Sequence, residues 1–337
     1  MSKKVKKFLQ IFAFFSVGIF IFWWVSKDQD INELKAAIEG ADLKWVWLCL
    51  MISVLSHISR ALRWNLLIDS MGYKSRKLNS FFAVLIMYVS NMTIPRSGEV
   101  VRCGVLAKTE DIPFAKLLGT VFIERVIDLI LLILLLVVVL LTQMHVVLDI
   151  LNNNPEIKEN LRDMASSYTV IIGIPAFVIL FIAMVYVFRR RLKKTKIYQK
   201  IRGLLHNFAE GIKTIYRMKR KFAFIAHSVF IYLMYFLMIY FAFYIFDFTE
   251  HLTLMAGLTV FVMSSFGMVA PSPGGMGTWH FMAIQTLIIY GVSDSDAYAF
   301  AITSHSTFTL LMIVLGVLAI ILLPVFNKET YKQKELH

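Results

Sequence analysis

Cysteine and long polar segments are both scarce in this chain of 337 residues. The two cysteines, Cys49 and Cys103, fall in or beside apolar segments, which indicates neither a disulfide framework nor a cysteine-based metal site. The longest polar stretch, residues 189–221, is shorter than the about 50 residues that a separate soluble domain needs. We therefore expect residues 1–337 to form a single integral membrane domain.

Several chemical motifs are also missing. The sequence has no Walker A motif, so we expect no ATP hydrolysis by this chain. It has no His and Glu spacing typical of a metal site and no motif around an activated nucleophile. We expect no metal or other cofactor, no catalytic residue and no nucleic-acid partner.

Apolar residues dominate the composition. They make up 58% of the chain, the mean hydropathy is +0.69, and runs long enough to cross a membrane recur along it. This is typical of an all-α polytopic membrane protein. The expected full-length spans are 8–25, 45–68, 114–142, 168–188, 222–246 and 297–326. No small-residue cleavage site follows the first span, so we expect it to be retained as a signal-anchor helix.

Two further apolar segments are interrupted by polar residues. Segment 79–112 breaks at IPRSGEVVR, and segment 252–290 breaks at APSPGGMGTWH. One interpretation is that each contains an ordinary span followed by a surface loop. The other is that each enters the membrane, breaks, and returns to the same side.

Loop charges favour the second interpretation, because Lys and Arg are retained on the cytoplasmic side. The basic segments are the N-terminus, 69–78 and 189–221. The acidic loops are 26–44, 143–167, 247–251 and 291–296. Both termini are then cytoplasmic, and each interrupted segment must return to the side from which it came. We expect about six full transmembrane helices and two re-entrant broken helical hairpins.

The order of these parts repeats along the chain. A span, a broken hairpin and a span make up residues 45–142, and the same order recurs in residues 222–326, with Pro95 and Pro271 at matching positions. We interpret this as an inverted repeat. Such repeats place a binding site where the broken segments meet, since non-helical backbone at membrane depth needs protein or a watery cavity around it.

The span 114–142 carries the charges Glu124, Arg125 and Asp128. The apolar part after Asp128 is about 21 Å long at 1.5 Å per residue, against a hydrocarbon core of about 30 Å, so these charges must dip into the membrane. An ionised group at the bilayer centre costs about 2.5–3.5 kcal/mol and therefore marks a partner or a functional site. An Arg125–Asp128 clasp that only holds helices together is the alternative, since the two residues are three apart.

The span 45–68 has a similar feature in SHISRALRWNLL. Arg60 and Arg63 either snorkel to lipid phosphates or line the cytoplasmic mouth of a site for an anionic headgroup, which guanidinium groups bind in a bidentate fashion. Trp64 is interpreted as an interfacial anchor.

The breaks of the two hairpins are expected to carry the rest of the site. The first has arginines beside a glutamate, and the second has glycines whose exposed backbone amides suit an anion. The candidate residues at the breaks are Asn91, Pro95, Arg96, Gly98, Glu99, Arg102, Pro271, Pro273, Gly274, Gly275, Gly277 and His280.

Three blocks of sequence, NMTIPRSGEVVR, GTVFIERVIDL and PSPGGMGTWHF, resemble the signature blocks of the lysylphosphatidylglycerol synthase transmembrane-region family, also described as flippase-like. The resemblance covers most of the chain and implies a lipid-translocating membrane domain. His280 departs from it, because an acidic residue often follows the glycines in this family. The soluble aminoacyl-transferase domain of synthase members has no counterpart in the sequence, so we expect this chain to move a lipid rather than to make one.

The expected function is therefore that of a lipid flippase or transporter for an anionic or lipid-linked headgroup in the bacterial inner membrane. A membrane-embedded transferase that uses Glu99, Glu124 or Asp128 as a base is one alternative, and an ion-coupled solute transporter or a non-catalytic partner protein is another. The expected partners are membrane lipids, with a separate biosynthetic enzyme or a second copy of the chain as further possibilities. The basic amphipathic segment 189–221 is expected on the anionic cytoplasmic leaflet, with a protein-docking helix as its alternative.

Overall fold

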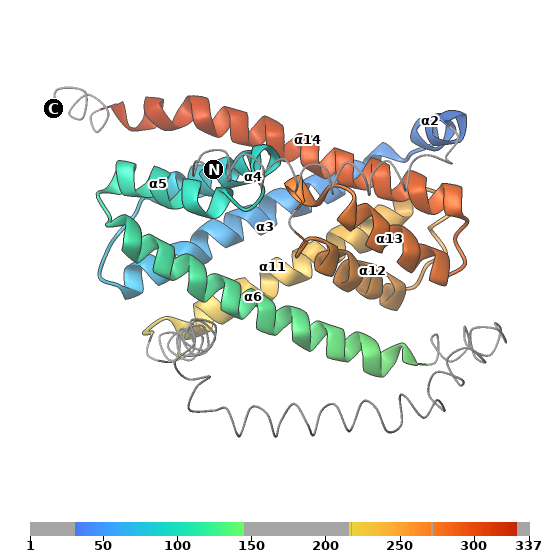
Figure 1. Ribbon diagram of the computed structural model, residues 1–337, viewed down its shortest axis with the longest axis horizontal. Coiled ribbons are helices and arrows are strands. Elements are labelled where there is room, and N and C mark those ends of the chain that lie inside the picture. The colour runs from blue at the N-terminus through green and yellow to red at the C-terminus, as the bar shows by residue number, and fades with distance from the viewer. Residues whose placement is uncertain (1–30, 145–215, 217, 271, 329–337) are drawn as a thin grey trace, which may run out of the picture. The chain divides into compact units, whose positions relative to one another are not determined.

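The computed structural model describes residues 31–144, 216, 218–270 and 272–328, and this part of the chain is entirely helical (Figure 1). The chain divides into two compact units. One is Met1–Val139 with Arg217–His337, and the other is Leu140–Tyr216, which lies almost wholly outside the described residues. The single-domain organisation therefore stays a prediction, and the fold below is that of the first unit.

Within the described residues, four helices are long and apolar enough to cross a membrane. They are α3 (Leu43–Ser70), α6 (Phe114–Thr142), α11 (Lys221–Ala242, extended by the 3₁₀ turn η2, Phe243–Ile245) and α14 (Asp294–Phe326). These helices correspond to four of the six expected full spans. The other two, 8–25 and 168–188, and most of the basic segment 189–221 lie outside the described residues.

Shorter helices occupy the two interrupted segments. The first contains α4 (Lys77–Thr93) and α5 (Gly98–Glu110), and the second contains α12 (Leu254–Gly267), the 3₁₀ turn η3 (Pro273–Gly275) and α13 (Thr278–Ile289). The two helices of each segment pack against each other. A helix of 14 residues, such as α12, is about 21 Å long, which is less than the about 30 Å of a hydrocarbon core. The inverted-repeat relation of the two segments stays a prediction.

Local sequence accounts for several helix ends. Asp42 caps α3 by accepting a hydrogen bond from the Lys44 amide at 2.8 Å, and Thr253 caps α12 by accepting one from the Ala256 amide at 3.2 Å. Ser293 caps α14 in the same way, at 3.2 Å from the Asp296 amide. The short helix α2 (Ile31–Glu39) precedes α3 and packs against α14.

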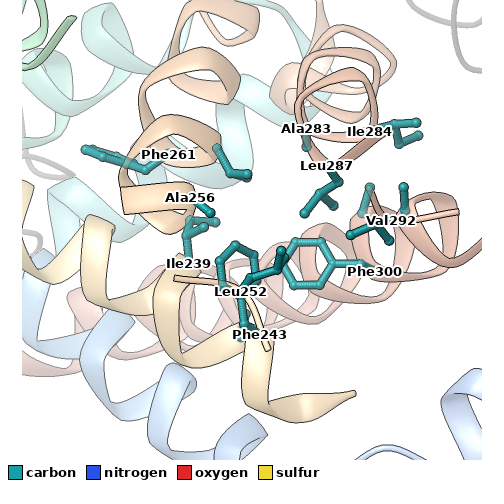
Figure 2. Close-up of a cluster of buried hydrophobic side chains, with 14 of the residues drawn as sticks. Ile239, Phe243, Leu252, Ala256, Phe261, Ala283, Ile284, Leu287, Val292 and Phe300 are labelled. Carbon is teal, nitrogen blue, oxygen red and sulfur yellow. The ribbon is translucent and has the colours of Figure 1, made fainter. Parts of the chain in front are cut away.

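The described unit has two halves in sequence, residues 31–142 and residues 218–328, and each has an apolar core. Figure 2 shows the core of the second half, where side chains of η2, α12, α13 and α14 meet, among them Phe243, Ala256, Leu287 and Phe300. A second cluster joins α3 through α6 in the first half; its buried members are Ala61, Trp64, Ile68, Ala83, Val84, Met87, Cys103, Leu106, Ile112, Leu117 and Val121. Cys49 and Cys103 are both free and buried.

Several helix contacts join the halves in the described part of the chain. Among them, helix α3 packs along α11, and α4 packs along α14 (Figure 1). The second contact depends on Gly316, where a Cβ atom would lie 2.9 Å from the Leu85 carbonyl oxygen and would also meet the Val89 side chain. At the end of α14, Asn327 exchanges two amide hydrogen bonds with Asn79 of α4, each 2.9 Å long. The start of α4, the first helix of the pair α4 and α5, is thus hydrogen-bonded to the end of α14.

Candidate functional site

A buried ion network joins α3, α5 and α6. Its centre is Arg63, whose side chain is fully buried. Its Nη1 donates to Oδ1 of Asp128 at 2.7 Å and to Oγ of Ser228 at 3.3 Å, while its Nε lies 3.5 Å from Oε1 of Glu124. This burial argues against the alternative in which Arg63 snorkels to the lipid surface, because both carboxylates hold it within the protein.

Arg102 brings the first helical pair into the same network. It donates to Oε2 of Glu124, both side chains are fully buried, and its guanidinium lies 4.6 Å from the ring centre of Trp64. Trp64 in turn donates its indole N–H to Oγ1 of Thr120 at 2.7 Å. The interpretation of Trp64 as an interfacial anchor is therefore wrong, since its ring is fully buried between Arg102 and α6.

The edge of the network is more exposed. Arg125, whose side chain is 42% exposed, lies 3.1 Å from Oδ2 of Asp128 and 4.0 Å from Oε1 of Glu99. The Arg125–Asp128 contact is present, but it is part of a larger network because Asp128 also binds Arg63. Tyr232 of α11 donates to the backbone carbonyl of Asp128 at 2.6 Å, which ties α6 to the second half.

Arg60 lies three residues before Arg63 on α3 and is only 7% exposed. Its guanidinium faces the ring of Tyr235 of α11 at 5.8 Å, and the Tyr235 hydroxyl is 3.3 Å from the hydroxyl of Tyr88 on α4. His57 lies against Tyr88, with the ring centres 4.6 Å apart. Arg60 is thus surrounded by aromatic and hydroxyl groups, and its burial also excludes snorkelling.

The charges of this region do not balance. Four arginines meet three carboxylates, which leaves one net positive charge. The four arginines are Arg60, Arg63, Arg102 and Arg125, and the three carboxylates are Glu99, Glu124 and Asp128. Buried charges are stable only when paired and hydrogen-bonded, so an excess cation favours the binding of an anion.

The turn between α4 and α5 has an unusual backbone. The backbone of Arg96 has φ 60°, a left-handed conformation that residues other than glycine rarely adopt. The Asn91 side chain accepts a hydrogen bond from the Gly98 amide at 2.8 Å. A Cβ on Gly98 would collide with the Met87 carbonyl and lie 2.8 Å from Cγ of Asn91, so this turn requires glycine there.

The turn between α12 and α13 is built on glycines and histidines. Gly274, Gly275 and Gly277 all have positive φ. The Gly277 amide donates to Nδ1 of His280 at 3.4 Å, and Nε2 of His305 on α14 lies 3.1 Å from the Gly274 carbonyl oxygen. The two histidine rings are 4.5 Å apart. Pro271 lies outside the described residues.

The two turns touch each other. Arg96 donates to the backbone carbonyl of Val269, and a Cβ on Gly274 would meet the sulfur of Met92. The candidates chosen from the sequence therefore form two groups in the described part of the chain: the ion network of α3, α5 and α6, and the pair of contacting turns.

Some members of these groups were not expected from the sequence. Tyr235 lies against Arg60 and is next to Tyr88, and His305 lies against His280. One signal was available for His305, because a histidine within the apolar segment 297–326 is costly unless it has a partner. Tyr88 and Tyr235 carry no such signal, since tyrosine is common in membrane helices.

Long apolar helices that enclose a network of arginines and carboxylates define an integral, multi-pass membrane protein with a polar interior. The chain belongs to the lysylphosphatidylglycerol synthase TM region family, whose model matches residues 10–316.

The chain is also similar to the UPF0104 membrane protein MJ1595 of Methanocaldococcus jannaschii. The two chains are 28% identical over 101 residues, which is 29% of this chain and 30% of the relative. The match thus covers under a third of that protein. No solved structure matches the chain.

Proposed function

We propose that this protein moves a lipid with an anionic headgroup between the two leaflets of a membrane. The observation that carries the proposal is the ion network with the adjacent Arg60, which together carry one excess positive charge among the described residues of a helical membrane domain. Membership of a family named for a lipid synthase's membrane region supports a role connected with lipids.

The proposed arrangement in the membrane is an inverted repeat of two re-entrant hairpins, with both termini in the cytoplasm of a bacterium and the chain in its inner membrane. The short helices α5, α12 and α13 and the contact of the two turns support it. The opposite charges of the loops 69–78 and 291–296 support the orientation.

The headgroup is proposed to meet the exposed cations first. Arg96 is exposed, and Arg125 is half-exposed at the edge of the network. Arg102 was expected to engage the headgroup directly, but its full burial and its contact with Glu124 favour a positioning role. In this role Arg102 fixes α5 against α6 and holds the Glu124 side chain next to Arg63.

A transferase that uses a carboxylate of this network as its base is less favoured by the geometry. Glu124 is held by Arg63 and Arg102, and Asp128 is held by Arg63 and Arg125. A carboxylate whose oxygens are engaged by two arginines is poorly placed to take a proton from a substrate. We therefore propose that the chain is not an enzyme, and that a separate enzyme supplies its lipid.

The test is translocation of a fluorescent phosphatidylglycerol in vesicles that contain the purified protein, with dithionite as the quencher of the outer leaflet. Arg125→Gln is expected to slow translocation about tenfold, because a hydrogen bond to a charged group contributes about 1.5–3 kcal/mol. Lys77→Gln is the matched control, since Lys77 is exposed at the start of α4, away from the network. Wild-type vesicles that exchange the lipid no faster than protein-free vesicles would contradict the proposal.

A further inference from the structure

We infer that Arg60, together with the hydroxyls of Tyr88 and Tyr235, forms a buried subsite for the phosphodiester of a lipid headgroup. The inference rests on the proposed function, and it names the group that the site recognises. Its residues come from α3, α4 and α11, and they lie beside the ion network rather than within it.

The first step is the pairing of the arginines. Arg63, Arg102 and Arg125 each have a carboxylate oxygen within 4.0 Å. Among the described residues Arg60 makes no such ion pair, although it is 93% buried, and its Nε has no hydrogen-bond partner. The excess positive charge of the region is therefore located at Arg60.

The second step is the set of donors around this guanidinium. The hydroxyls of Tyr88 and Tyr235 are 3.3 Å apart, so that one donates to the other and one O–H remains to donate elsewhere. Nδ1 of His57 is also buried without a hydrogen-bond partner, while its Nε2 lies 3.4 Å from Oγ of Ser53. An arginine, a hydroxyl and an imidazole together suit the oxygens of a phosphate.

The third step is the amount of charge. The region has one net positive charge, which a single negative charge neutralises. A phosphodiester carries one negative charge, whereas a phosphomonoester carries about 1.5–2 negative charges at pH 7. The site therefore favours the phosphodiester of a phospholipid over a free phosphate or a terminal phosphate group.

The subsite also joins the first helical pair to two of the long helices. Tyr88 lies on α4 of the first helical pair, whereas Arg60 and Tyr235 lie on the long helices α3 and α11, which pack against each other. A phosphate bound to all three would hold the helical pair against α3 and α11. Its release would remove that link.

The test measures binding in detergent, without transport. The probe is dihexanoyl phosphatidylglycerol below its micelle concentration, and the readouts are calorimetric affinity and the shift in melting temperature. We expect the wild type to bind it and Arg60→Gln to bind it about tenfold to a hundredfold more weakly, as expected for loss of a charged hydrogen bond. Lys77→Gln, which removes the same charge from the surface, is expected to bind like the wild type.

The unliganded variants separate a ligand-binding arginine from a structural one. Arg60→Gln is expected to melt at or above the wild-type temperature without lipid, since it removes a buried cation that has no carboxylate partner. Arg102→Gln is expected to melt lower, because it leaves Glu124 with less compensation. An Arg60→Gln protein that melts as low as Arg102→Gln would overturn the inference.

Two further probes decide the ligand class. Dihexanoyl glycerol, which lacks the phosphate, and sodium phosphate, which lacks the lipid, are both expected to bind at least about tenfold more weakly than dihexanoyl phosphatidylglycerol. Equal binding of either probe would overturn the assignment to a lipid phosphodiester. Arg60-dependent binding without translocation in vesicles would instead leave the subsite standing and contradict the proposed function.

Discussion

Glu124 is the residue on which the buried network depends most. It contacts Arg63 at 3.5 Å and also accepts from Arg102, and all three side chains are fully buried. Removal of its charge leaves two buried guanidinium groups with less compensation in a setting of low dielectric constant. The stability of the fold therefore depends on the contacts of Glu124 with the two arginines, whatever the function of the site.

The corresponding prediction compares two glutamates. Glu124→Gln is expected to lower the free energy of unfolding by about 3–5 kcal/mol, the cost of breaking a buried ion pair. Glu99→Gln is expected to lower it by less than about 1 kcal/mol, since Glu99 is 25% exposed and lies 4.0 Å from a half-exposed arginine. Denaturant-induced unfolding in detergent micelles measures both. Equal losses would mean that the burial of Glu124 does not govern its contribution.

The sequence identified the charged members of the network but not most of the contacts between them. Helical spacing offered the Arg125–Asp128 contact as one alternative, and this contact lies within α6. It gave no information on the contact of Arg102 with Glu124, because that contact joins α5 to α6. Trp64 was misjudged for the same reason: a tryptophan near a helix end resembles an interfacial anchor unless its neighbours are known.

At the scale of elements, the contact between the two turns is the feature that joins the helical pairs. The turn after α4 contributes Arg96, which donates to the carbonyl of Val269, and the end of α4 contributes Met92, which faces Gly274. Figure 1 shows the two pairs on neighbouring parts of the described unit. The proline and glycine positions predicted the breaks, but backbone contacts between breaks leave no pattern in the sequence.

A double-mutant cycle tests this contact. Gly274→Ala is expected to destabilise the protein by about 1–2 kcal/mol, because alanine is disfavoured at φ 58° and because its Cβ would displace the Met92 sulfur. Met92→Ala removes the obstacle, so the double variant is expected to recover about 0.5 kcal/mol or more relative to additivity. Melting of the four proteins in detergent gives the coupling. Strict additivity would mean that the turns do not touch in the detergent-solubilised protein.

At the scale of the whole molecule, the distribution of apolar surface agrees with a membrane location. Large apolar side chains on the long helices are exposed, for example Leu134 at 56%, Leu310 at 62% and Ile321 at 59%. The most buried charged groups, Arg63, Arg102 and Glu124, lie inside. An exposed apolar surface of this kind would cause aggregation in water and is covered by lipid in a bilayer. Hydropathy predicted the four long helices, since long apolar runs are visible in the sequence alone.

Hydropathy does not decide how the shorter helices lie in the membrane, and the proposed topology makes that question testable. Loop charges predict that Lys74 is cytoplasmic and Asp294 is external. Both residues are exposed, so a cysteine at either position can react with a membrane-impermeant maleimide. The background protein carries Cys49→Ala and Cys103→Ala, and intact and inverted vesicles present the two sides.

We expect Lys74→Cys to be labelled only from the cytoplasmic side and Asp294→Cys only from the outside. The decisive positions are Thr93→Cys and Met268→Cys, which stand next to the two turns and are exposed in the protein. If both helical pairs re-enter, these cysteines lie at membrane depth and react more slowly than either loop cysteine, because the reagent must enter a narrow polar space. If α4 crosses the membrane as an ordinary span, Thr93→Cys is labelled from the outside as fast as Asp294→Cys. That result would reject the re-entrant hairpin, and with it the inverted repeat on which the proposed pathway between leaflets depends.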